Sequence, residues 1–168
     1  MSSYLFGGAL FAVLVGMTAV SSQRVGSANE EAAVAAALRH VLTEFAGEDL
    51  IEGRGEVVGP LYLCLSSEVA LDVEEVGAEL SSTVIVPIPA QDCATKRVEG
   101  DFGMFTAMIY HYAPNGDEAA HMTVAGLSCW GMTSCLVDID MFGSGDRYSL
   151  ERSSGTWKVI AQRNRWIV

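Results

Sequence analysis

The stretch CLVDIDMFGSGDRYSLERSSGTWKVI, residues 135–160, decides the fold because its apolar side chains recur at every second position. Val137 and Ile139 would face one side of a strand, and Asp138 and Asp140 would face the other. This alternation is typical of an antiparallel sheet with one face on the core and the other in water. Residues 135–160 therefore predict two-sided β-structure.

The same two-residue period extends over most of the chain after Phe102. Turn-forming stretches rich in Gly, Asn, Asp and Ser separate the segments that carry it. Connections this short join neighbouring antiparallel strands, so we expect a β-meander. Its predicted strands are Thr106–Tyr112, Ala120–Ser128, Cys135–Phe142, Arg147–Arg152 and Thr156–Ile160.

The segment before Phe102 predicts shorter elements. Leu61–Ser66 and residues 84–86 are apolar enough for strands, and we expect Pro87 and Pro89 to end the second one. Asp72 precedes Glu75 by three residues, a spacing typical of a capping box that opens a short helix to about Leu80.

Residues 29–46 predict an amphipathic helix. Its apolar stripe recurs at helical spacing and is formed by Val34, Leu38, Val41 and Phe45. Gly47 follows where a helix commonly ends in a left-handed residue. The predicted fold is α+β: an N-terminal amphipathic helix packed on a curved antiparallel β-meander, within one domain over residues 29–168.

The N-terminus predicts export. Residues 4–20 are an uninterrupted apolar run, near the lower limit for a membrane-spanning helix. Ala19 and Ser21 supply small residues for cleavage, whereas the absence of Lys and Arg before Arg24 favours retention. Residues 1–21 are therefore a signal peptide or a membrane anchor, and 22–28 are a linker. Either alternative places the domain outside the cytoplasm, in the periplasm or secreted, and the uncleaved segment would hold it at the membrane.

The charge balance bears on partners. The chain has 10 Lys and Arg against 21 Asp and Glu, a formal net charge of −11. Nucleic-acid binding needs a basic surface that displaces counterions from phosphates, so this composition argues against a nucleic-acid partner.

The end of the chain resembles known proteins. Its pattern Tyr-x-Leu-x-Arg-x-x-Gly-x-Trp-x-Val resembles small exported bacterial domains of uncharacterised function, and also the nuclear-transport-factor-2-like cone fold. The residues that carry the pattern are Tyr148, Leu150, Arg152, Gly155, Trp157 and Val159. The resemblance covers the last third of the chain and implies a helix-first, sheet-after architecture, but no active site.

The four cysteines predict two structural disulfides. Cys129 and Cys135 flank a five-residue segment that we expect to be a hairpin loop, so they would face each other across two strands. By elimination, Cys64 would pair with Cys93. Free buried thiols and metal or redox chemistry are the alternatives, but the spacing is not that of a C-x2-C site.

Two histidines are candidate functional residues. A turn at Asn115-Gly116-Asp117 predicts a register in which His111 lies opposite His121. Adjacent imidazoles could hold a metal with Asp138 or Asp140, although a solvated cross-strand pair is the simpler interpretation. On a wet face, the two aspartates would serve solubility. We predict no catalytic residue, no cofactor and no assigned metal.

The favoured function is a binding module without catalysis. The partner, a protein or a small ligand, would lie between the helix and the concave sheet face. Tyr110, Tyr112 and Tyr148 would line that cavity, and Trp130 would offer an exposed aromatic side chain. The alternatives are a cone-fold enzyme with a small-molecule cavity and an accessory subunit of a membrane complex.

Overall fold

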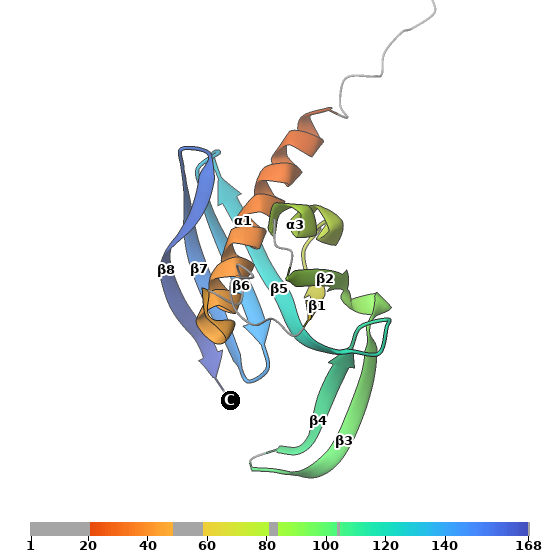
Figure 1. Cartoon of the computed structure of the whole chain (residues 1–168). Coiled ribbons are helices and arrows are strands. Elements are labelled where there is room, and N and C mark those ends of the chain that lie inside the picture. Colours follow the sequence, from red (N-terminus) through yellow and green to blue (C-terminus); the bar gives the residue numbers. More distant parts are fainter. Residues whose placement is uncertain (1–20, 49–58, 81–83, 104, 168) are drawn as a thin grey trace, which may run out of the picture.

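The computed structural model describes residues 21–48, 59–80, 84–103 and 105–167. Over these residues it contains two α-helices, one short 3-10 helix and an open sheet of eight strands (Figure 1). The predicted α+β class is confirmed at this level.

Helix α1 spans Ser21–Ala46 and begins eight residues before the predicted start at Asn29. It therefore includes residues 22–28, which were predicted as a linker, because this stretch contains no proline to stop a helix. The predicted end is confirmed: Gly47 has φ +82°, and its N–H donates to the carbonyl oxygen of Thr43 at 2.9 Å. Helix α3 spans Val73–Leu80 and is capped by Asp72, whose Oδ1 accepts the N–H groups of Glu74 and Glu75.

The sheet contains both parallel and antiparallel pairs, whereas only antiparallel pairing was predicted. Strands β5 to β8 form the expected antiparallel meander, but β1 pairs in parallel with both β2 and β5. A parallel pair needs a crossover connection, and α3 lies in the connection between β1 and β2. The strands are β1 Leu61–Ser67, β2 Ile85–Pro89, β3 Ala94–Phe102, β4 Phe105–Tyr112, β5 Glu118–Trp130, β6 Ser134–Met141, β7 Ser144–Ser153 and β8 Thr156–Ile167.

Strand β2 includes Pro87 and Pro89, which were predicted to end it. In the strand order β2-β1-β5-β6-β7-β8, β2 lies at an edge, where a missing N–H costs no ladder bond. The short 3-10 helix η1, Ala90–Asp92, follows it directly.

The core is formed by the apolar stripe of helix α1 and by the inward-facing alternate residues of the sheet. Val34, Leu38 and Val41 of α1 are at most 1% exposed, and they belong to one cluster with Val137 and Ile139 of β6. Phe45 does not join them, because its side chain is 70% exposed at the end of the helix. Core side chains thus lie between helix α1 and strand β6, on the face of the sheet where a ligand was predicted.

The hairpin formed by β3 and β4 projects away from the rest of the sheet (Figure 1). Strand β3 was not predicted, because most of its residues are exposed and it has no alternating apolar face. Strand β4 pairs with β5 at only two positions, His111 with Ala119 and Tyr112 with Glu118. Among the described residues, strand pairing therefore joins the hairpin to β5 only at its base.

Candidate functional site: the hairpin cleft

A cleft of about 740 Å³ lies where β4 separates from β5. Strands β4 and β6 share one edge of β5: β4 pairs with it at residues 118–119, and β6 pairs with it from Met122 onward. Near the far end of β4, the rings of Phe105 and Phe142 approach to 5.1 Å. We call this space the hairpin cleft; it is lined by Thr95, Ala107, Met108, Ile109, Tyr110, His111, Glu118, Ala119, His121, Thr123, Asp140, Met141 and Phe142.

His111 and His121 meet in this cleft. Their rings are stacked, with centroids 4.2 Å apart and planes within 4°. The predicted register is wrong by two residues, since His111 lies opposite Ala119 rather than His121. The rings still reach each other because diagonal neighbours on two strands lie within range of long or aromatic side chains.

Burial lowers the pKa of both histidines. For His111 the cause is loss of solvation, and for His121 loss of solvation is reinforced by repulsion from His111. The neutral form of each imidazole is therefore favoured, and each ring can donate one hydrogen bond and accept another. A neutral pair suits recognition of a polar ligand.

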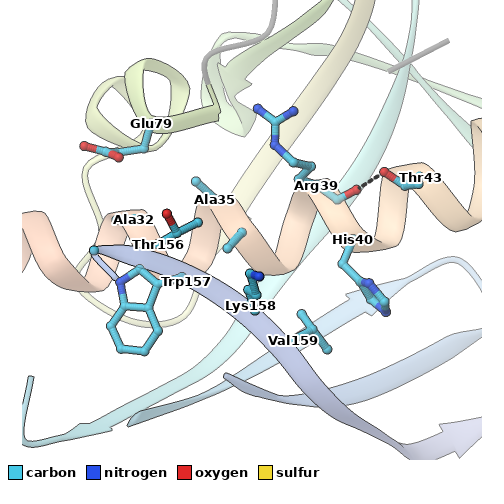
Figure 2. Close-up of a pocket in the computed structure, with 12 residues that line it drawn as sticks. Ala32, Ala35, Arg39, His40, Thr43, Glu79, Thr156, Trp157, Lys158 and Val159 are labelled. Carbon is cyan, nitrogen blue, oxygen red and sulfur yellow. Dashed lines mark hydrogen bonds between the residues drawn. The ribbon is translucent and has the colours of Figure 1, made fainter. Parts of the chain in front are cut away.

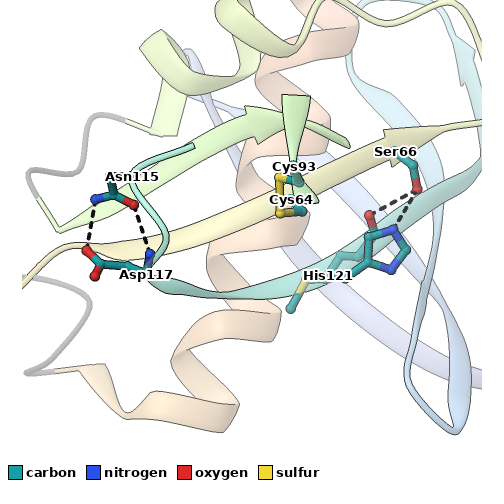
Figure 3. The surroundings of a disulfide bond; sticks show 7 residues. Cys64, Ser66, Cys93, Asn115, Asp117 and His121 are labelled. Carbon is teal, nitrogen blue, oxygen red and sulfur yellow. Dashed lines mark hydrogen bonds between the residues drawn. A yellow bond between two sulfur atoms is a disulfide. The ribbon is translucent and has the colours of Figure 1, made fainter. Parts of the chain in front are cut away.

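A hydroxyl group of β1 contacts the pair from the next strand. Ser66 Oγ lies 3.2 Å from His121 Nε2 (Figure 3). It also lies 2.6 Å from Thr123 Oγ1. Ser66 has Thr123 as its parallel-strand partner, so the sheet register places these groups together. Sequence analysis missed Ser66 and Thr123, because a parallel neighbour far away in the chain leaves no local signal.

The Cys64–Cys93 disulfide fixes the base of the hairpin beside this group (Figure 3). Cys64 is the β1 partner of His121, and Cys93 immediately precedes β3. The second disulfide, Cys129–Cys135, joins directly opposite residues of β5 and β6. Both predicted pairings are confirmed, and the first one ties the cleft to the sheet.

Asp140 contributes a carboxylate to the cleft wall. It accepts hydrogen bonds from Arg165 Nη1 at 2.8 Å and from Trp166 Nε1 at 3.3 Å. The close approach of Trp166 requires Gly145, since a Cβ there would collide with the indole and with the carboxylate. A β-bulge between Gly145 and Asp146 lets consecutive residues of β8 reach one carboxylate.

Asp138 is buried, in contrast to the wet position expected for it. Its side chain forms a bidentate pair with Arg147, at 2.6 and 2.7 Å, and Arg165 lies 3.5 Å away. The hydrogen bonds from Arg147 lower its pKa. It lies against Gly126, where a bulge in β5 makes room for the carboxylate. The predicted aspartate pair thus belongs to an ion-pair network rather than to a solvated surface.

The other predicted ligand-binding residues are scattered. Tyr110 lines the hairpin cleft, and Tyr112 is half-buried at the base of the hairpin. Tyr148 is 1% exposed in the core, edge-on to His40, and burial raises the pKa of its hydroxyl. Trp130 is 54% exposed at the far end of β5. The fold brings Tyr110 to the histidines, but not Tyr148 or Trp130.

A second cleft, of about 510 Å³, lies between α1 and β8 (Figure 2). Arg39 and His40 line it from the helix, and Trp157 and Lys158 line it from the strand. Trp157 contributes little surface to this cleft, because its side chain is only 7% exposed and packs in the core. The hairpin cleft instead gathers polar groups that the core does not use.

Within the part of the chain that the structure describes, no three His, Cys, Asp or Glu residues are grouped closely enough to hold a metal. His111 and His121 therefore stand as a pair. Across the same residues, no helix combines the length and the apolar character needed to cross a membrane. The apolar run 4–20 lies outside the described residues.

Comparisons of the chain with protein-family models, curated proteins and solved structures find no match. The resemblance to the cone fold and to small exported domains stays a prediction.

Proposed function

We propose that this chain is an extracytoplasmic, disulfide-stabilised module that binds a ligand in the hairpin cleft and does not catalyse a reaction. Its two disulfides support a location in an oxidising compartment. The apolar run 4–20 would export or tether it.

The hairpin cleft is the observation that carries this proposal. Its volume of about 740 Å³ lies within the range of small-molecule sites, about 300–1,000 Å³. It combines apolar side chains, such as Met108 and Phe142, with the polar groups of His121, Thr123 and Asp140. Apolar walls with a few convergent polar groups are typical of a binding site.

The contact between Ser66 and His121 keeps an enzyme as the second candidate. A hydroxyl beside an imidazole is the first part of a nucleophilic site. A catalytic imidazole is usually oriented by a third polar group, however, and His121 stacks on His111 instead. Labelling of the wild type, but not of Ser66→Ala, by a fluorophosphonate probe would favour the enzyme; we expect no labelling.

A matched pair of variants tests the binding proposal. Ile109 and Ile160 are 56% and 57% exposed, but only Ile109 lines the hairpin cleft. Thermal unfolding would be followed with amino acids, mono- and disaccharides, short fatty acids and tripeptides as probes. A ligand at 100 times its Kd stabilises by about 2.7 kcal/mol, or roughly 5–10 °C for a domain of this size.

We expect at least one probe class to raise the Tm of the wild type and of Ile160→Arg, but not that of Ile109→Arg. The proposal fails if no probe raises the Tm, or if Ile109→Arg responds like the wild type.

A further inference from the structure

Five consecutive residues of β4, from Ala107 to His111, line the hairpin cleft. Side chains of a strand alternate between its two faces, so a space on one face would contact every second residue. A space that contacts every residue in turn runs along the edge of the strand, where the backbone N–H and C=O groups lie. The hairpin cleft is therefore bounded on one side by a strand edge.

The hydrogen-bond pattern identifies the backbone groups at this edge. The N–H of Ala113 donates to the carbonyl oxygen of Asp117, at the start of the β4–β5 pairing. Hydrogen-bonded positions alternate in an antiparallel pair, so His111 also directs its backbone groups toward β5. Ile109 and Ala107 point the same way, but β5 has no residue opposite them among the pairs of the described chain.

The backbone groups of Ile109 therefore lie on an unpaired strand edge that faces the hairpin cleft. The other edge of β4 is occupied by β3, whose pairing runs from Tyr112 back to Ala107. An edge of this kind is a template for another extended chain. The two residues of β4 that pair with β5, together with the Cys64–Cys93 disulfide, fix the base of the hairpin. The edge of β4 is therefore positioned before any ligand binds.

We propose that the ligand of the hairpin cleft is an extended peptide segment that adds to β4 as a strand over residues 106–110. This inference rests on the proposed binding function and names its ligand class. Main-chain hydrogen bonds to Ile109 and Ala107 would supply affinity that is largely independent of sequence. Alternate peptide side chains would meet the polar wall at His121 and Thr123, which would supply selectivity.

The probe is a linear heptapeptide selected from a phage-displayed library on the oxidised full chain, then synthesised with a fluorophore. Its Kd is measured by fluorescence polarisation, with the peptide N-methylated at one position at a time. In strand addition, every second peptide N–H points at the receiving edge. We expect methylation of one alternate set to weaken binding at least tenfold and methylation of the other set to change it less than threefold.

A backbone change in the protein gives a second readout. Ile109→Pro removes the N–H that faces the cleft without removing a β3 bond, whereas Ile109→Ala removes most of the side chain and keeps the N–H. With circular dichroism confirming the fold, we expect Ile109→Pro to bind at least tenfold more weakly than Ile109→Ala. Should Ile109→Pro not fold, the N-methylation series decides alone.

Failure to select any peptide, or N-methylation effects without a two-residue period, overturns the inference. If small molecules still raise the Tm of the wild type and of Ile160→Arg only, the binding function stands and the peptide assignment alone is wrong. If a peptide binds equally well to Ile109→Arg, the peptide site lies elsewhere and the inference fails, while the binding function is still decided by the Tm of Ile109→Arg with the small-molecule probes.

Discussion

Truncation of Trp157 to alanine tests the assignment of the core face. Its side chain is 7% exposed and belongs to the cluster that joins α1 to the sheet. A buried tryptophan removes about 150–250 Å² from water, which at about 25 cal/mol per Å² is roughly 4–6 kcal/mol. Measured losses for such truncations are about 3–5 kcal/mol. Because domains are stable by about 5–15 kcal/mol, Trp157→Ala should nearly unfold the protein.

Trp130 is the matched control, because it is 54% exposed on a strand of the same sheet. By the same area estimate, its truncation should cost about half as much, about 2–3 kcal/mol at most. Trp157→Phe is a second control: Trp157 Nε1 is buried without a hydrogen-bond partner in the described part of the chain, so phenylalanine loses no polar contact there. It should restore most of the stability.

The assay is equilibrium unfolding in urea, followed by far-UV circular dichroism so that both tryptophans can be replaced without losing the signal. We expect the unfolding midpoint to fall most for Trp157→Ala and clearly less for both Trp157→Phe and Trp130→Ala. If Trp130→Ala is the more damaging of the two alanine variants, the assignment of the sheet faces is refuted.

Three further changes probe particular contacts. Glu31 is 3% exposed, and burial raises its pKa, so its charged form destabilises the fold as the pH rises above about 4.5. Glu31→Gln should therefore increase the free energy of unfolding in urea by about 1 kcal/mol at pH 8 and leave it unchanged at pH 4. Gly145→Ala should cost about 1–3 kcal/mol and shift indole fluorescence, because the added Cβ displaces the indole packed there. Serine in place of both cysteines should cost about 4 kcal/mol for Cys64–Cys93 but about 2 kcal/mol for Cys129–Cys135, since the sequence separations are 29 and 6 residues; equal losses of Tm would contradict this.

The elements that could be predicted are those in which apolar and polar side chains alternate with the period of the element itself. Strands β6 and β7 alternate between core and outer face, so their period was visible in the chain. The Cys129–Cys135 pairing followed from the same logic, because residues that flank a short turn face each other. Strand β3 lacks such an alternation, because both of its faces are largely exposed. Nothing in its sequence, ATKRVEGDF, distinguishes a strand from a loop.

The site was predictable only in part, because it depends on which strands become neighbours. The meander assumption placed β4 along the whole of β5, which brought His111 and His121 together through the wrong register. It gave no reason to expect β1 beside β5, and so Ser66 escaped notice. Sequence patterns report which face a residue occupies, whereas strand order is decided by long-range packing that leaves no local mark.

The hairpin cleft follows from this strand order. Strand β1 takes one edge of β5 in parallel, so β4 and β6 must share the other edge. Strand β6 pairs from Met122 onward and is itself covered by β7, which leaves β4 only two pairs before it diverges. An ordinary hairpin would have closed that edge along its whole length. Here no strand of the described chain closes it, and this is the edge of β4 to which we propose that a peptide adds.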